Sequence, residues 1–168
     1  MRIHRFACNV LKRFPALAGI LFAGCMAASS SGHTLPVQPA CLISGDRAIG
    51  VSLEIARSPD QRRRGLMHRT DLAPGAGMLF VYPSQRGPDQ GFWMYNTLIP
   101  LDIAYLNRKG TILATDKMAP CPSEQQADCP VYKAGVSFSR ALEMNQGFFY
   151  HHSIGIGDRL SLDPSDCR

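Results

Sequence analysis

The chain has 168 residues, 45% of them hydrophobic, with 18 Lys and Arg against 13 Asp and Glu. Four of the basic residues and none of the acidic ones lie in the first two dozen positions, so 14 basic residues face 13 acidic ones in the remainder. This near balance argues against a nucleic-acid partner and against electrostatic attachment to an acidic membrane, because both need a sustained basic surface.

The N-terminal segment is typical of an export signal. Basic residues precede an apolar run over residues 14–23 that is too short to span a bilayer comfortably, so we expect residues 1–24 to be removed as a signal peptide. Residues 21–25 resemble a bacterial lipobox in which Cys25 is acylated, and simple cleavage among residues 27–29 is the alternative. Either route predicts an exported protein, in the periplasm or held at a membrane by lipid.

Residues 25–40 are rich in Ser, Gly, Thr and Pro and show no apolar periodicity, which predicts a flexible tether. Residues 41–168 are enough for one domain with one core, and they contain no internal repeat.

With Cys8 in the signal and Cys25 at its cleavage site, four cysteines remain, and an even number in an oxidising compartment favours disulfides. Cys121 and Cys129 bracket a polar loop and are predicted to pair. Cys41 and Cys167 lie near the two ends of the domain, which are often close in space, so they are predicted to form a second bridge. A zinc or redox site is less favoured, because no Cys-x-x-Cys pair is present.

The first predicted elements are a strand and a short helix. Residues 51–56 alternate apolar and polar side chains, which is typical of a half-buried strand. A helix is then predicted from Pro59, with Ser58 as its N-cap, Gln61 completing a capping box, and Gly65 ending it.

The rest of the chain predicts short strands joined by turns. A hairpin turn is expected at residues 107–110, and a brief helical turn over residues 146–152. This pattern favours a mainly β single domain, either an antiparallel curved sheet or a small barrel with one or two short helices; parallel α/β architecture is disfavoured. The further strands are predicted at residues 78–82, 91–95, 101–106, 111–117, 141–145 and 159–162.

A set of short motifs runs through the predicted domain: Gly65-Leu66-Met67 with Arg69, Gly77-Met78-Leu79-Phe80, Phe92-Trp93-Met94 with Asn96-Thr97, Pro100-Leu101-Asp102, Leu142-Glu143 and Gly157-Asp158. Together they resemble the motifs of domain-of-unknown-function family 192. The resemblance covers about residues 50–162 and implies a compact, mostly β fold without an established activity. Tyr95 departs from the family, which usually carries Lys there, so a role for a cation at this position is in doubt. Ala141 also departs, since a bulkier residue is usual.

These motifs predict a ligand pocket centred on Trp93 and Asp102, with an apolar majority and a few polar groups to orient the ligand. The alternative is that the same side chains are only core. A carboxylate among apolar strand residues needs a partner, with Arg63 and Arg69 as candidates for Asp102 and Glu54. The predicted lining is Met67, Met78, Phe80, Phe92, Trp93, Met94, Asn96, Thr97 and Asp102, supported by Glu54, Arg63, Arg69, Glu143 and Asp158.

Two function classes follow, and an enzyme is less favoured than either. In the first, the domain binds a small molecule or an envelope protein through the Trp93 surface. In the second, it handles Cu(I) through the thioethers of Met67, Met78 and Met94. A hydrolase would use Asp102 or Glu54 with His68, but the sequence has no nucleophile elbow, no metalloprotease motif and no phosphate loop, and predicts no catalytic residue, cofactor or metal ligand.

Overall fold

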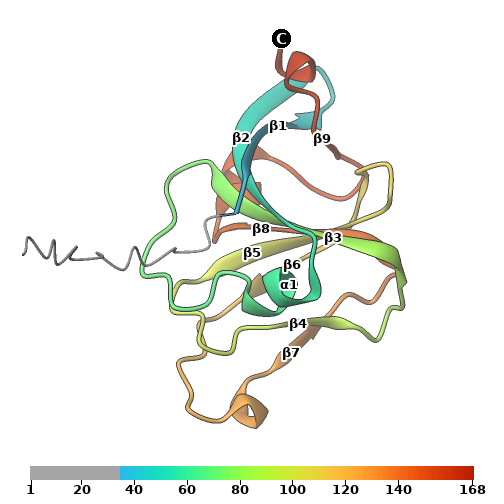
Figure 1. Cartoon of the computed structure of the whole chain (residues 1–168). Helices are drawn as coiled ribbons and strands as arrows, with labels where there is room; N and C mark the ends of the chain where they lie inside the picture. The colour runs from blue at the N-terminus through green and yellow to red at the C-terminus, as the bar shows by residue number, and fades with distance from the viewer. Residues whose placement is uncertain (1–34) are drawn as a thin grey trace, which may run out of the picture. The chain divides into compact units, whose positions relative to one another are not determined.

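The structure is a computed structural model that describes residues 35–168 (Figure 1). The predicted signal peptide, Cys25 and most of the predicted tether therefore lie outside the described residues. Among residues 35–168, none of the helices combines the length and the apolar character needed to cross a membrane.

Two sheets make up the fold, which confirms the prediction of a mainly β domain. The large sheet has the strand order β6-β5-β8-β3-β2-β1-β9, and β4 pairs with β7 in a separate ribbon that lies below it in Figure 1. The strands are β1 (Val37–Ser44), β2 (Arg47–Ala56), β3 (Ala76–Arg86), β4 (Gly91–Trp93), β5 (Leu101–Leu106), β6 (Ile112–Met118), β7 (Val131–Lys133), β8 (Phe138–Asn145) and β9 (Arg159–Ser161).

The large sheet curls until its two edge strands approach each other. Thr111, just before β6, bridges to Arg159 of β9, and the Leu160 N–H donates to the Gly110 carbonyl at 2.9 Å. One pair, β2 with β3, is parallel, so the expectation of a wholly antiparallel sheet is wrong there. The reason is the connection through α1 (Pro59–Arg64), which returns the chain to the end from which β2 started.

The two faces of the sheet hold two separate cores. All seven strands contribute side chains to the first, for example Leu53, Leu79 and Leu142, so it fills the enclosed side; we call it the inner core. The short helix α2 (Phe148–His152) adds Phe149 to it. The second, here called the outer core, lies between β3, β5 and β8 on one side and the β4–β7 ribbon on the other.

Helix α1 forms as its local sequence predicts. The Gln61 N–H donates to the Ser58 hydroxyl at 3.2 Å, and the Ser58 N–H donates to the Gln61 side-chain oxygen at 2.8 Å, which completes the capping box. The helix ends at Gly65, whose φ of 48° favours glycine. The predicted turns at residues 107–110 and 146–152 are also present, the latter as α2.

The described part of the predicted tether is partly a strand. β1 begins at Val37, and Pro39 lies opposite Ser52 of β2, so residues 37–40, which were predicted to belong to the tether, are part of a strand. The strand accommodates Pro39 because its other neighbour, β9, pairs only with residues 41–43 and leaves that edge open at residue 39.

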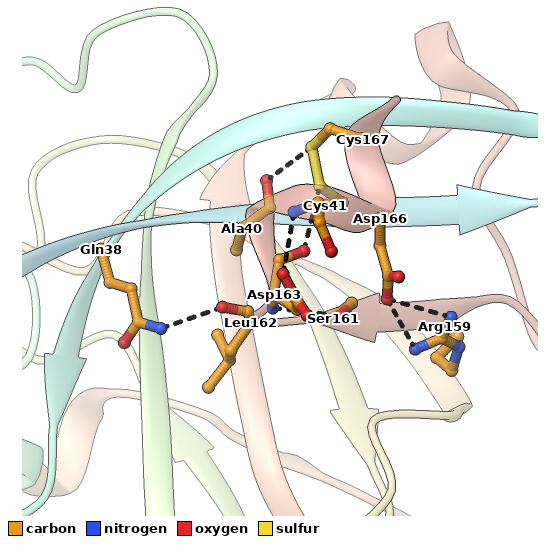
Figure 2. Close-up of a disulfide and its surroundings, with 10 residues drawn as sticks. Gln38, Ala40, Cys41, Arg159, Ser161, Leu162, Asp163, Asp166 and Cys167 are labelled. Carbon is orange, nitrogen blue, oxygen red and sulfur yellow. Dashed lines mark hydrogen bonds and ion pairs between the residues drawn. A yellow bond between two sulfur atoms is a disulfide. The ribbon is translucent and has the colours of Figure 1, made fainter.

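Both predicted disulfides are present. Cys41 of β1 is bonded to Cys167 in the 3₁₀ turn Pro164–Cys167, with 5.6 Å between the Cα atoms (Figure 2). The same figure shows Gln38 donating to the Leu162 carbonyl, at 3.1 Å, so the C-terminal segment is fastened to β1 at two points. Cys121 is bonded to Cys129, which closes the loop that contains the 3₁₀ turn Gln126–Asp128.

Candidate functional site

The outer core opens into a hollow of about 420 Å³ between α1, the end of β3 and strand β4. A volume of this size is within the range of small-molecule sites. Apolar and aromatic side chains from three elements form its walls, arginines stand among its lining, and a single carboxyl from β8 reaches it. The lining residues are Pro59, Arg62, Arg63, Arg64, Gly65, Leu66, Met67, Phe80, Tyr82, Pro83, Ser84, Arg86, Gly91, Phe92, Trp93, Thr97, Val131 and Glu143.

The aromatic side chains that line the hollow pack against further aromatic residues of the outer core. Phe80 and Phe92 meet edge to face with ring centroids 4.8 Å apart, and Phe92 in turn lies 6.0 Å from the ring of Tyr105. The Tyr105 hydroxyl donates to the carbonyl of Tyr132 in β7 at 2.7 Å, which ties the ribbon to the large sheet. Such edge-to-face contacts fix ring orientation, so this wall is preorganised.

Glu143 is the one carboxylate in the lining of this hollow, and it comes from the middle of the large sheet. Its strand, β8, runs between β3 and β5, where Met78 and Ile103 are its register partners. The residue is only 4% exposed, and no described residue forms an ion pair with it. Burial alone raises the pKa of Glu143 to about 8, so the carboxyl is protonated at neutral pH and can donate a hydrogen bond.

Four arginines line the same hollow without neutralising Glu143. Arg62 is anchored, since its guanidinium donates to the Val81 carbonyl at 3.1 Å and lies 4.8 Å from the centre of the Tyr82 ring. Arg63 pairs with Asp60 across the exposed surface. Arg64 and Arg86 form no ion pair with any carboxylate of residues 35–168. The lining therefore combines positive charge with a neutral acid.

Trp93 stands between this hollow and a second one. It is 37% exposed and lines both, and the second hollow, of about 530 Å³, also contains Met67, His68 and Tyr95. Tyr95 directs its hydroxyl to the carbonyl of Glu124 at 3.4 Å. The side chain there is thus engaged with the disulfide-closed loop.

The structure brings together five of the nine predicted lining residues. Met67, Phe80, Phe92, Trp93 and Thr97 all line the first hollow.

The remaining four do not line it. Met78 and Met94 are 1% exposed in the outer core, and Asn96 forms the adjacent turn. Asn96 adopts a positive φ of 53°, and its carbonyl accepts the His68 N–H at 2.8 Å, so this residue joins the two loops beside Trp93. The fourth is Asp102.

The prediction that Trp93 and Asp102 line the same hollow is wrong. Asp102 alternates along β5 with Leu101 and Ile103, which belong to the outer core, so its side chain points to the inner side. One carboxylate oxygen there accepts the Phe149 N–H at 3.2 Å. The other has no hydrogen-bond partner in the described structure. Asp102 thus takes the place of a side-chain cap for α2, whose own N-cap is Gly147.

The predicted supporting residues make structural contacts. Glu54 forms a salt bridge with Arg69 at 2.6 Å, so one of the two candidate arginines is its partner, and neither is the partner of Asp102. Asp158 accepts the Gly155 N–H at 2.7 Å in the turn before β9. These carboxylates are occupied, which sets Glu143 apart.

The arrangement gives little support to the two alternative chemistries. Two of the three methionines suggested for Cu(I), Met78 and Met94, are core side chains. For the hydrolase, His68 lies at the second hollow while Asp102 is on the other face of the sheet.

Sequence reasoning placed Glu143 in a supporting role and missed its position in the lining. A signal was available, because Leu142 and Met144 flank it in an apolar strand, as Leu101 and Ile103 flank Asp102. Arg86, Tyr82 and Val131 were missed for a different reason. They come from a strand end and from the ribbon, whose pairing is long-range.

Comparison with known proteins agrees with the fold. The sequence profile of family DUF192, described as an uncharacterised ACR, matches residues 41–162. The structure of a proposed transcription regulator from Sinorhizobium meliloti 1021 is similar, with a TM-score of 0.67 and 31% identity over 76% of this chain and 95% of that one. A protein of unknown function from Novosphingobium aromaticivorans DSM 12444 has a TM-score of 0.64 and 27% identity, over 79% and 89% respectively. The comparison with curated proteins found no match.

Proposed function

Because the chain belongs to the uncharacterised DUF192 family, whose description supplies no reaction, we propose from the site itself that this domain binds a small molecule in the Trp93–Glu143 hollow. Trp93 and Phe92 provide flat apolar surfaces for the ligand, and Glu143 and Thr97 provide polar groups that orient it.

One observation carries this proposal: the carboxyl of Glu143, which forms no ion pair with any of residues 35–168, lies in the lining of an aromatic hollow. Burying a carboxyl without a partner is costly, and a well-packed apolar side chain would stabilise the sheet better at this position. Glu143 is therefore better explained by a group that enters the hollow than by the packing of the outer core. The other buried or half-buried carboxylates of the site region already have protein partners.

We also propose that the domain works outside the cytoplasm. The N-terminal sequence has the features of an export signal, and both disulfides are of the kind that persists in an oxidising compartment. Fractionation of cells producing the full-length chain tests this. Recovery from the periplasm or the membrane fraction is expected, and cytoplasmic protein with free thiols would contradict it. A Cys25→Ser variant separates the two export routes, since only a lipid-anchored form moves from the membrane to the soluble fraction.

Native mass spectrometry of the exported protein tests the binding function. The wild-type protein is expected to carry an additional mass that is released on denaturation. Glu143→Leu and Trp93→Ala should lose this mass while keeping the thermal unfolding transition. Lys109→Ser with Lys117→Ser, two exposed residues away from the hollow, is the control and should keep it. Wild-type protein without bound mass, and with no response of Trp93 fluorescence to a cell extract, would refute the proposal.

A further inference from the structure

Resting on the proposed binding function, we infer the chemical class of the ligand. It is an amphipathic anion that places its negative group beside Arg64 and Arg86 and an uncharged oxygen, such as a ketone or amide carbonyl, against Glu143. Three features of the hollow carry this inference, namely the charge of its arginines, the protonation of its one carboxyl and the character of its walls.

The arginines select the charge. Four of them line the hollow, and Glu143 is the only acidic residue in the same lining. Because Arg63 is paired with Asp60, and Arg64 and Arg86 have no carboxylate partner among residues 35–168, positive charge is left uncompensated around the hollow. A carboxylate or phosphate compensates it, and guanidinium groups suit both in geometry and charge. A cationic ligand would be repelled.

The carboxyl of Glu143 indicates which group the ligand carries at its other end. Buried between Met78 and Ile103, Glu143 carries a proton at neutral pH and therefore offers an O–H donor. The complementary group is an uncharged oxygen acceptor, because a second carboxylate placed there would raise the cost of burial further. Thr97, which is 5% exposed and lines the same hollow, offers a hydroxyl nearby.

The apolar walls of the hollow indicate the chemical character of the ligand between its two end groups. Phe80, Phe92 and Leu66 are buried apolar residues, so an aliphatic or aromatic segment suits them. An ordinary phospholipid chain fits less well, because it ends in a methyl group and leaves the Glu143 donor unsatisfied. A soluble compound with a charged end, an apolar middle and a carbonyl end satisfies all three features.

Trp93 offers a specific measurement, since it is the only tryptophan in the chain and its indole N–H gives one NMR cross-peak. The exported protein is titrated with 5-oxohexanoate, 7-oxooctanoate and 9-oxodecanoate, which vary the spacing of the two end groups. At least one is expected to shift the peak saturably. Octanoate, which lacks the ketone, and 2-octanone, which lacks the charge, should each bind at least about tenfold more weakly than 7-oxooctanoate.

Variants separate the two end contacts. Arg64→Ser with Arg86→Ser should weaken 7-oxooctanoate about tenfold and leave 2-octanone unchanged, and Lys109→Ser with Lys117→Ser should change neither. Glu143→Leu should abolish the preference for 7-oxooctanoate over octanoate, whereas Glu143→Gln, which keeps a neutral donor, should retain it.

The inference on ligand class is overturned if no oxo-alkanoate shifts the peak, if 2-octanone binds as tightly as 7-oxooctanoate, or if the arginine variants have no effect. A mass that co-purifies with wild-type protein in those cases shows that the binding function survives and only the ligand class is wrong. If no oxo-alkanoate shifts the peak and no mass co-purifies, the proposed binding function is wrong as well.

Discussion

Asp102 and Glu143 occupy comparable places on the two faces of one sheet, yet their surroundings differ. Both are carboxylates in buried strands, on β5 and β8, and Glu143 pairs in register with Ile103, the residue after Asp102. Asp102 faces the enclosed side and holds the N–H of Phe149, so it fastens α2. Glu143 faces a hollow and forms no ion pair with any of residues 35–168. Of the two carboxylates, Glu143 lines a hollow and is therefore the candidate for binding, whereas Asp102 is enclosed and holds α2.

The disulfide Cys41–Cys167 includes no residue of the hollow's lining, so breaking it should lower stability without affecting binding. Cys41→Ser with Cys167→Ser opens a bridge with a sequence separation of 126 residues that clamps the C-terminal segment to β1. In the chain-entropy model such a bridge contributes about 5 kcal/mol to the free energy of unfolding. Urea denaturation should show a loss near this size, and Trp93 should respond to 7-oxooctanoate as in the wild type wherever the variant is folded. A loss below about 1 kcal/mol would contradict the clamp.

Replacing Glu143 by Gln should stabilise the protein at alkaline pH. The carboxyl has a pKa of about 8 in the folded state against an ordinary value of 4.5, so between these values the folded state holds a proton that the unfolded state has lost. The contribution of Glu143 to stability is therefore greatest below about pH 4.5 and is lost as the pH rises to about 8. The free energy of unfolding of the wild type should fall by at most about 5 kcal/mol relative to Glu143→Gln across this window.

The other groups near Glu143 do not produce the same slope. Arginine guanidinium groups in general keep their charge throughout this pH range, and burial raises the pKa of Tyr82 and of Tyr105 above the ordinary value of 10. His68, in the second hollow, is removed in a His68→Gln control. Urea denaturation at pH 5, 7 and 9 gives the comparison, and parallel curves for wild type and Glu143→Gln would sink the prediction.

Changing Asp102 should affect the fold without affecting the hollow. Asp102→Ala leaves the Phe149 N–H without its acceptor, and such a loss costs about 2 kcal/mol, whereas Asp102→Asn keeps an acceptor oxygen and should cost less. Thermal unfolding measures the difference, and the Trp93 indole peak should respond to 7-oxooctanoate as in the wild type. A lost response in folded Asp102→Asn would mean that the two faces are coupled.

The smallest effect on stability is expected at Trp93, together with the largest effect on binding. Because the side chain is 37% exposed, Trp93→Ala should lower the free energy of unfolding by about 1 kcal/mol, and Trp93→Phe by less. Isothermal titration with 7-oxooctanoate should show no binding to Trp93→Ala and weakened binding to Trp93→Phe. An unfolded Trp93→Ala variant would instead support a role confined to the core.

The elements that depend on contacts between residues close in sequence could be predicted. Ser58, Pro59, Gln61 and Gly65 define α1 through bonds within one turn, and for that reason the prediction of this helix is confirmed. The three-residue strand β7 could not be predicted, because its partner β4 lies 40 residues earlier in the chain and neither strand is long enough to show a period.

Only part of the site could be predicted, because the sequence of a strand does not show what packs against each of its faces. Alternation along β5 separates Asp102 from its neighbours, but it does not tell which face of the strand is enclosed and which opens into a hollow. That choice depends on the β4–β7 ribbon and on α1, which cover only one side of the sheet. Asp102 was noticed because apolar residues flank it, whereas Glu143 was named only within the Leu142-Glu143 motif and as a supporting residue. The packing shows that Glu143, and not Asp102, lines the hollow.

Titration of the side-chain carboxyl of Glu143 by carbon-13 NMR, with and without 7-oxooctanoate, measures the protonation on which the proposed site depends. We expect a midpoint at about pH 8 in the free protein, because burial destabilises the ionised form of the carboxyl. The ligand should raise the midpoint further, since it accepts a hydrogen bond only from the protonated form. A midpoint near 4.5 that 7-oxooctanoate leaves unchanged would show that Glu143 is an ordinary solvated carboxylate, and the proposed site would fall with it.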